Sequence, residues 1–295
     1  LVMGFSYLAV GSLTRARWSF VLGGRPELST AYSLESAFDE IVFTVGPLLA
    51  TLLATQADPI LALAVGAALV AVGAPWLRSR RDSEPPPHPA GTPRQRSALR
   101  YPGMLLLTFV SLAMGAVFAS AEVTMVAFAG QHGSRALSGV LLAAFALGSC
   151  VAGFAYGARH RSAPLLDRFR RQAVLFGLLP VLFLLAPDIP VLAVCAFVVG
   201  LGIAPTLITA FGLIETLVPA TSLTEGLAWV TTGIGIGYGA GSSLVGGIAD
   251  AHGARLAFLV TVAAGLAMAA LAVVLHRRLS VPVSQPAVVC PDLGR

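Results

Sequence analysis

Long stretches without any ionisable side chain are the feature that most restricts how this chain can fold. Residues 59–77, 136–158, 226–249 and 256–275 contain no Asp, Glu, Arg, Lys or His. Each stretch is 19 to 24 residues long, and about 20 apolar residues span a bilayer as a helix. The pattern therefore predicts an all-α integral membrane protein with several transmembrane helices.

The composition excludes the common soluble classes. The chain is 56% hydrophobic and 11% charged, whereas soluble domains carry about 25% charged residues. Its three cysteines and five histidines are scattered, so neither a disulfide framework nor a metal site is indicated. No Ser/His/Asp set and no phosphate-binding loop is evident either. The sequence therefore predicts neither an enzyme nor a bound cofactor.

The apolar stretches, taken in order, predict nine transmembrane spans. Pro187-Asp188-Ile189-Pro190 separates two of them, and this turn chemistry is typical of a hairpin between helices. The sixth span is short, so Arg170 and Arg171 are expected at its end, with side chains that reach toward the interface. The predicted spans are residues 1–13, 31–55, 59–77, 103–128, 136–158, 172–187, 189–213, 226–249 and 256–275.

The arginines indicate an orientation. All 19 basic residues are arginines, and only Arg135 and Arg255 lie in one set of connections between spans. The other 17 lie in the connections 14–30, 78–102, 159–171 and 214–225 and in the tail after His276. The positive-inside rule therefore places this second set in the cytoplasm of a cell-membrane protein, together with the C-terminus.

Residues 78–102 are basic and rich in proline, as expected of a flexible linker. We expect the linker to separate the last three spans of an N-terminal half (1–77) from a six-helix half (103–278), which a tail (279–295) follows. Residues 1–13 would rise only about 20 Å as a helix, against a hydrocarbon core of about 30 Å. The orientation also requires an odd number of earlier spans, so three more are expected upstream, in a twelve-helix parent.

Several motifs resemble the major facilitator superfamily of secondary transporters. They are GGIADAHGARLAFLV (246–260), GFAYGARHR (153–161), VGPLLA (45–50) and TRARWSFVL (14–22) with AYSLESAFDEIVFTVGP (31–47). The last two are similar to actinobacterial permeases of the efflux type. The resemblance implies two six-helix halves that rock around a site at the membrane midplane. It names no substrate.

Three acids precede an apolar run at the start of the predicted span 31–55. Glu35 and Asp39 are four residues apart and share a helix face, while Glu40 lies about 100° away. Near the cytoplasmic end of a helix they would favour its N-terminus through the macrodipole. They could pair there with Arg15, Arg17 or Arg25, as an anchor or gate. A direct role in proton transfer is the alternative.

Glu122 is the strongest single candidate for transport. It lies about two-thirds along the predicted span 103–128, and an acid at this depth costs about 1 to 3 kcal/mol on insertion scales. Such a residue is expected to face the bundle interior, where it could bind a proton or a cationic substrate. The alternative is a position close enough to the outer surface to be hydrated.

Some residues interrupt otherwise apolar helices. Gly46-Pro47 is expected to bend its helix or to admit a close neighbour. Pro205, Thr206 and Thr209 could expose backbone groups to a cavity, although simple packing explains them equally well.

Glycines and aromatic residues mark the span 226–249. Gly233, Gly237 and Gly241 form a small-xxx-small face that predicts close helix contact, and a sliding contact of this kind could serve gating. Trp229 and Tyr238 could line a cavity, or they could pack or face lipid.

The loop before this span suggests a helix cap. Ser222 is a possible N-cap residue, and Glu225 stands three positions later, as in a capping box. Glu215 begins the same loop.

The sequence therefore predicts a secondary transporter that exports a small organic compound in exchange for protons. An importer or uniporter of the same fold, or a membrane sensor or scaffold that binds ligand without moving it, is the alternative. The expected partners are the substrate, protons and lipid, without nucleic acid, and the expected state is a monomer.

Overall fold

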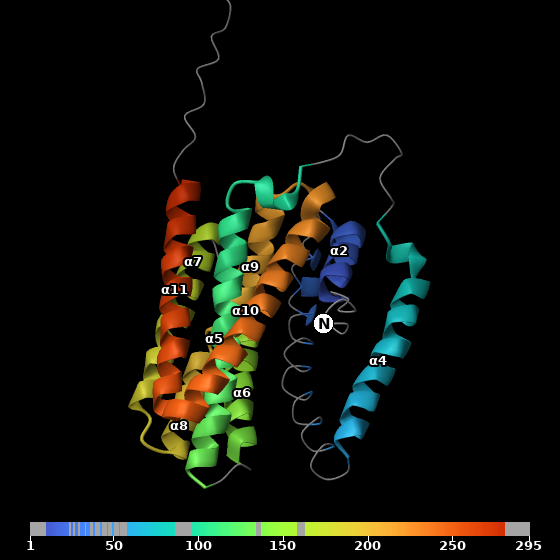
Figure 1. Ribbon diagram of the computed structural model, residues 1–295. Helices are drawn as coiled ribbons and strands as arrows, with labels where there is room; N and C mark the ends of the chain where they lie inside the picture. The colour runs from blue at the N-terminus through green and yellow to red at the C-terminus, as the bar shows by residue number, and fades with distance from the viewer. Residues whose placement is uncertain are drawn as a thin grey trace, which may run out of the picture.

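The computed structural model describes residues 10–23, 58–85, 96–133, 137–157 and 163–280 continuously. It also describes the single positions 25, 27, 28, 30–32, 34, 35, 38, 42, 46, 49 and 53. Within these residues the regular elements are all helices (Figure 1).

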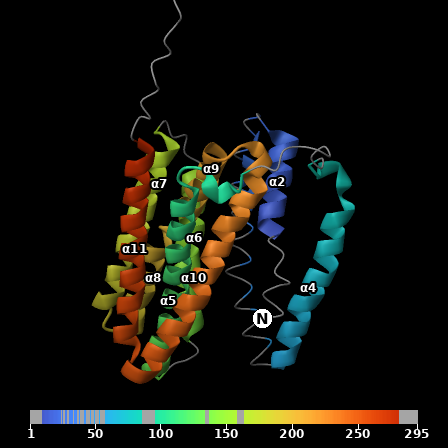
Figure 2. The same ribbon diagram turned by 45° about the horizontal axis from the view of Figure 1, so that its top comes forward.

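The second part of the chain forms an antiparallel helical bundle (Figures 1 and 2). We call the end at which α5 begins and α11 ends the linker end, because η2 (Ala98–Arg100) lies there (top of Figure 1). The helices are α5 (Met104–Gln131), α6 (Ser138–Gly157), α7 (Leu165–Leu178) with η4 (Leu179–Leu185), α8 (Ile189–Gly200), α9 (Ile203–Leu217), α10 (Leu223–His252) and α11 (Ala254–Ser280).

α5 is the central helix and contacts α10, α11 and α6. Its buried residues run from Met104 to Ala129 and cover most of its circumference, while Leu105, Phe109 and Val126 are exposed on the remaining face. Large apolar side chains fill the space around it: Phe128, Phe169, Phe176, Phe183 and Phe258 are almost fully buried. Close packing of such side chains holds these helices together through van der Waals contacts, because lipid tails are as apolar as the side chains.

Glycines bring three pairs of helices into backbone contact. Gly237 of α10 packs on α5, and Gly148 of α6 packs on Gly200 of α8. In the third pair, Gly177 of α7 faces Gly265 of α11. An added Cβ at any of these positions would overlap a main-chain atom of the neighbouring helix. Small residues of this kind allow helix axes to approach closely, as is common in membrane bundles.

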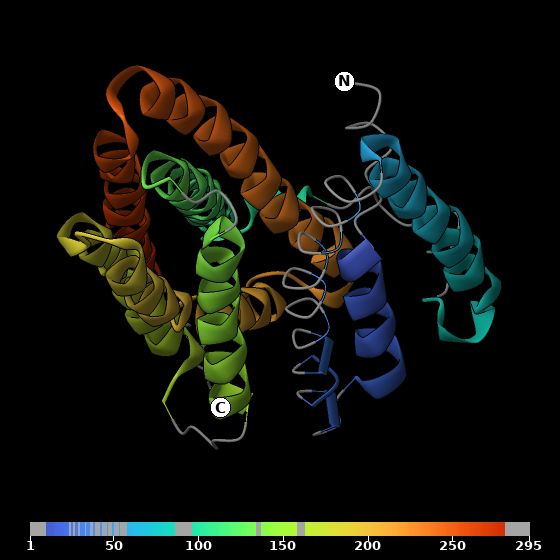
Figure 3. The ribbon, with the colours of Figure 1, turned by 90° about the horizontal axis from the view of Figure 1, so that it is seen from below.

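Two of the continuously described helices come before the bundle in the sequence, and they lie beside it (Figure 3). α2 (Val10–Leu22) is adjacent to α10, and α4 (Pro59–Ser79) lies farther out (Figure 1). Asp58 caps α4 by accepting a hydrogen bond from the Ile60 amide at 2.7 Å. Arg17 of α2 donates to the carbonyl oxygens of Leu77 and Arg80 at 2.9 and 2.8 Å, and it thereby joins α2 to the C-terminal end of α4.

The α4 surface is apolar and exposed, including Ile60 at 72% and Leu69 at 70%.

Four helical segments of the described residues are long and apolar enough to cross a membrane: Met104–Gln131, Ser138–Gly157, Ile189–Leu217 and Ala254–Ser280. These observations agree with the predicted all-α membrane fold.

Two predicted boundaries are wrong. The connection 14–30 is helical as far as Leu22, because Arg15 and Arg17 find partners inside the structure and do not end the helix. The sixth span begins at Leu165 and not at residue 172. Its first turns are polar outside but bury Phe169, so an apolar stretch could not mark where they start. Arg170 therefore lies in the second turn and not at the helix end.

Residues 189–213, which were expected to form one continuous span, lie within the segment Ile189–Leu217, which is long and apolar enough to cross a membrane. α8 and α9 are separated by a turn at Leu201–Gly202. A Cβ at Gly202 would lie 2.7 Å from Cβ of Phe176, so the chain passes very close to α7 at this turn. The hairpin predicted before α8 is present: Asp188 accepts a hydrogen bond from the Val191 amide at 3.0 Å and caps the helix.

Candidate functional site

Glu122 is half-buried on α5 and is hydrogen-bonded to a tyrosine of another helix. The hydroxyl of Tyr238 donates to Oε2 of Glu122 at an O–O distance of 2.6 Å. α5 has 28 residues, and Glu122 lies within about 7 Å of its midpoint along the axis. Tyr238 is at the middle of α10, which has 30 residues. The pair therefore lies at a depth that corresponds to the hydrocarbon core of a bilayer, about 30 Å thick.

A cavity of about 260 Å³ lies beside this pair. Val123 and Val126 line it with Glu122 from α5, Leu142 lines it from α6, and Tyr238 from α10. Of the described residues, no basic side chain forms an ion pair with Glu122. A charged carboxylate in apolar surroundings is costly unless it is paired and hydrogen-bonded. The arrangement is therefore suited to hold either a proton on Glu122 or a cation beside it.

The glycine face of α10 positions the two sides of this site. A Cβ at Gly237 would overlap the carbonyl oxygen of Leu112, and one at Gly115 would overlap a carbonyl oxygen of α10. Gly233 and Gly241 are buried on the same face and also approach α5 closely. The close helix contact predicted from this spacing is confirmed, while the gating role of these glycines stays a prediction.

The two aromatic candidates of α10 differ in their surroundings. Tyr238 lines the cavity, which is one of the two alternatives left open by the sequence. Trp229 is 37% exposed, and its indole Nε1 donates to Oε1 of Glu225 at 3.2 Å. Trp229 therefore belongs to the linker end of the bundle and not to the cavity.

A second group of polar side chains joins α2 to α9 at the linker end. Nε of Arg15 lies 3.8 Å from Oε1 of Glu35, and both side chains are largely buried. Arg15 also contacts the ring of Phe211, and the hydroxyl of Tyr32 is hydrogen-bonded to Glu215. The ion pair predicted between Glu35 and a nearby arginine is therefore present. Tyr32 and Phe211 were not predicted, because they are partners only through the tertiary fold.

The rest of that acidic segment is described only in part. Asp39, Glu40 and Pro47 lie outside the described residues, so the roles predicted for them stay predictions. Gly46 is half-buried, and no atom outside its own helix backbone lies within 4 Å of the place that a Cβ would occupy.

The predicted capping box is wrong. Ser222 is the N-cap residue of α10 but makes no capping hydrogen bond with its side chain. Glu225 accepts a hydrogen bond from the hydroxyl of Ser97 at 2.6 Å, and a second from the backbone amide of Ala98. Glu225 is therefore hydrogen-bonded to the linker residues Ser97 and Ala98, and not to Ser222 as the capping box predicted. Glu225 precedes the apolar part of α10, and the hydroxyl of Ser97 holds the pKa of its carboxyl below the ordinary value.

Thr206 and Thr209 lie inside the bundle. Both are fully buried in α9. Their hydroxyl groups donate to carbonyl oxygens one turn earlier, those of Gly202 and Pro205, each at 2.7 Å. This back-bonding satisfies buried polar groups, so packing explains these two residues.

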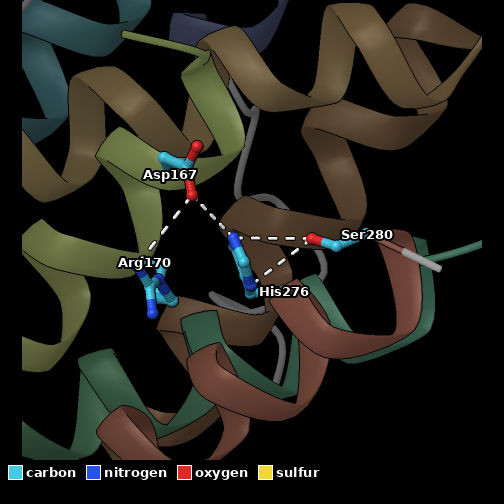
Figure 4. A network of polar contacts seen from close by, with 4 residues as sticks. All are labelled: Asp167, Arg170, His276 and Ser280. Atoms are coloured by element: carbon cyan, nitrogen blue, oxygen red, sulfur yellow. Dashed lines mark hydrogen bonds and ion pairs between the residues drawn. The ribbon is translucent and has the colours of Figure 1, made fainter.

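A polar network that no local pattern predicts joins α7 to α11 at the linker end (Figure 4). Nε2 of His276 lies 2.7 Å from Oδ1 of Asp167, and Nη2 of Arg170 lies 3.9 Å from the same oxygen. Ser280 Oγ lies 3.4 Å from each ring nitrogen of His276. Asp167 and His276 are 109 positions apart, so only the fold brings them together.

One family model matches the chain twice. The model of the Major Facilitator Superfamily matches residues 2–162 and residues 162–288. No curated protein and no solved structure matches the chain. The long apolar helices and the all-helical bundle agree with the architecture of this family. Since the two matches cover nearly its whole length, the chain belongs to the Major Facilitator Superfamily.

Proposed function

We propose that this protein is a proton-coupled transporter that exports a small organic compound by alternating access, with Glu122 as the group that gains and loses the proton. Membership of the superfamily makes the chain a multi-pass secondary transporter of small molecules. The proposal adds the coupling ion, its site and the direction of transport.

The observation that supports coupling at Glu122 is its hydrogen bond to Tyr238 at the edge of a largely aliphatic cavity. In such surroundings the neutral acid needs no counterion, whereas the carboxylate needs compensation. Tyr238 supplies one hydrogen bond to the carboxylate. Either protonation state can therefore exist in the site, and a change of solvent access can shift the balance between them. Intramembrane carboxylates of this kind are typical of proton pathways.

Export is supported by the similarity of residues 14–22 and 31–47 to efflux-type permeases. The orientation is supported by the arginine distribution, which favours a cytoplasmic linker end. In this orientation Glu35, paired with Arg15, lies near the cytoplasmic end, and Asp39 and Glu40 follow it in the sequence. We therefore assign them to anchoring or gating, and Glu122 to coupling.

Infrared spectroscopy of the purified protein tests the proton site without knowledge of the substrate. A protonated carboxyl in apolar surroundings has a C=O stretching band that disappears on ionisation. We expect a band that titrates in the wild-type protein, is absent in Glu122→Gln and persists in Glu225→Gln, the matched acid at the linker end. A band that persists in Glu122→Gln would show that another acid is the proton site.

A further inference from the structure

We propose that the line along which α7 and α11 pack, the α7–α11 seam, binds the headgroup of an anionic phospholipid at its linker end. The guanidinium groups of Arg170, Arg171 and Arg277 surround the phosphate. This inference does not depend on the proton site or on the direction of transport. Neither α7 nor α11 contributes a described residue to the cavity beside Glu122.

The three arginines lie where the two helices leave the apolar part of the membrane. Residues 256–275 of α11 contain no ionisable side chain, and as a helix they rise about 30 Å, the thickness of the hydrocarbon core. Arg277 follows closely after this stretch. On α7, Arg170 and Arg171 stand directly before the predicted apolar span 172–187. All three therefore lie at the level of the lipid headgroups.

Contacts between α7 and α11 bring these arginines into one region. Nε2 of His276 lies 2.7 Å from Oδ1 of Asp167 at the linker end of the seam (Figure 4). Farther along the seam, the backbones touch at Gly177 and Gly265. Arg170 pairs with the same Asp167 oxygen, so it lies at the seam itself.

Arg170 has hydrogen-bond donors without partners. Its Nη2 is 3.9 Å from Oδ1 of Asp167, which is too long for a hydrogen bond. Its Nε is buried and has no acceptor among the described residues. A buried donor without a partner is costly, and a phosphate commonly accepts two parallel hydrogen bonds from one guanidinium. Because the side chain as a whole is 38% exposed, a small rotation would present Nε and Nη2 to a phosphate at the surface.

Two exposed arginines flank this position. Arg171 follows Arg170 on α7, and Arg277 follows His276 on α11. Of the described residues, none forms an ion pair or a hydrogen bond with either side chain. Asp167 is the one acid beside these three arginines, so the region keeps an excess of positive charge. An anion with hydrogen-bond acceptors matches that excess.

The apolar surface next to these arginines favours a lipid over a soluble phosphate. Leu175 and Leu178 of α7 are exposed on the same helix face as Arg171, at i+4 and i+7. Leu259 and Leu266 of α11 are exposed on the face that Arg277 continues toward the linker end. Each exposed arginine therefore ends an apolar stripe that acyl chains can cover. A free phosphate would contact the arginines and leave both stripes unused.

Native mass spectrometry of the purified full chain with two added lipids tests the inference. Dioleoyl phosphatidylglycerol has a net negative charge, whereas dioleoyl phosphatidylcholine has the same chains and phosphate but a compensating choline. Each basic residue near anionic lipid contributes about fivefold to affinity. We therefore expect saturable binding of phosphatidylglycerol, about tenfold or more tighter than phosphatidylcholine. Inorganic phosphate at millimolar concentration should not displace the lipid.

Variants locate the site. Arg170→Gln, Arg171→Gln and Arg277→Gln should each lower the preference for phosphatidylglycerol by roughly fivefold, and together they should remove it. Two substitutions that lose the same charge elsewhere are the controls. Arg255→Gln is exposed at the other end of α11, and Arg81→Gln lies in η1 (Arg81–Ser83), which contacts α2 at the linker end. Both should leave the preference unchanged.

Size-exclusion profiles show whether each variant is folded. If the triple variant does not fold, Arg171→Gln combined with Arg277→Gln gives the same test, because both side chains are exposed.

Each outcome decides the inference. A preference that falls only in the α7 and α11 variants would support it. Equal binding of the two lipids by the wild type would overturn it. A preference that persists in the triple variant would place the lipid elsewhere, and one that falls equally in Arg81→Gln would reflect only the overall charge of this end. Either result would overturn the inference, and displacement by inorganic phosphate would overturn the lipid as the ligand.

Discussion

Arg15 of α2 stacks on Phe211 of α9, with its guanidinium carbon 4.1 Å from the centroid of the ring. The same arginine is 5% exposed and pairs with Glu35. A cation that is stacked on a ring and paired with an acid in a buried position is strongly held. Arg15 therefore attaches α2 to the helical bundle at the linker end.

Arg15→Gln should destabilise the protein, because it leaves Glu35 buried without its partner. Breaking a buried pair costs about 3–5 kcal/mol, and we expect a fall in Tm of roughly 5 °C or more in thermal unfolding of the detergent-solubilised protein. Arg25→Gln is the matched control, since Arg25 is exposed, and its Tm should be close to that of the wild type. Equal effects of the two substitutions would contradict the assigned role of Arg15.

Tyr238→Phe should separate the hydrogen bond to Glu122 from the aromatic ring. Loss of the hydroxyl removes the hydrogen-bond donor to Oε2 of Glu122, so the C=O stretching band of the protonated Glu122 carboxyl should shift in frequency. The ring remains, so Tm should fall only by the small amount that one hydrogen bond contributes. Infrared spectroscopy and thermal unfolding of the purified variant measure the two effects. An unchanged band would mean that Tyr238 does not act on Glu122.

Gly237→Ala and Gly239→Ala should have opposite effects on stability. A Cβ at Gly237 would overlap the Leu112 carbonyl oxygen, whereas nothing lies within 4 Å of one at Gly239. Forcing atoms into a well-packed contact costs about 1–3 kcal/mol, while Ala in an open helix position gains roughly 0.5–1 kcal/mol over Gly. Thermal unfolding of the two variants side by side gives the comparison. A Gly237→Ala protein as stable as the wild type would show that α5 and α10 can separate easily.

Acid should release the linker from α10. The pKa of Glu225 is lowered by the Ser97 hydroxyl, so the contact is fully present at neutral pH. It should be lost as the pH falls below the ordinary glutamate value of 4.5. Trp229 reports the change, because its indole donates to the same carboxylate. In a Trp18→Phe, Trp76→Phe background, its fluorescence should titrate in this acidic range.

The control is the same background with Glu225→Gln, whose fluorescence should not titrate there. Because Glu225 is exposed to solvent, overall stability should change little during this titration. A titration that persists in Glu225→Gln would assign the signal to another group.

Labelling of single cysteines tests the orientation. With the native cysteines replaced, Ser83→Cys at the linker end should be protected from a membrane-impermeant maleimide in intact cells. His132→Cys, exposed between α5 and α6 at the opposite end, should react. The reverse pattern would invert the proposed topology.

Hydropathy predicted most of the bundle because the apolar stretches coincide with the helices. The predicted spans 103–128 and 256–275 lie within α5 and α11, and the turn before Pro190 was recognised from its local chemistry. The errors arise where the determinants are distant in the sequence. α7 begins earlier than its apolar stretch because Phe169 is buried by neighbouring helices.

The same limit applies to the candidate site. Depth and the absence of nearby charge made Glu122 conspicuous in the sequence. Its hydrogen-bond partner could not be predicted, because Tyr238 is 116 positions away in the sequence. The sequence alone also does not say which face of α10 packs against α5. The pattern Ser222-x-x-Glu225 misled for a related reason: the linker offered Glu225 better partners than the local backbone.

The glycine contacts join six helices into three pairs: α5 with α10, α6 with α8, and α7 with α11. Within each pair the two backbones are in direct contact, and no side chain lies between them that could change rotamer and let them slide. Glu122 and Tyr238 belong to one pair, while Leu142, which also lines the cavity, belongs to another. A movement of one pair relative to another would therefore change the width of the pocket, while the carboxylate of Glu122 and the hydroxyl of Tyr238 would keep their distance.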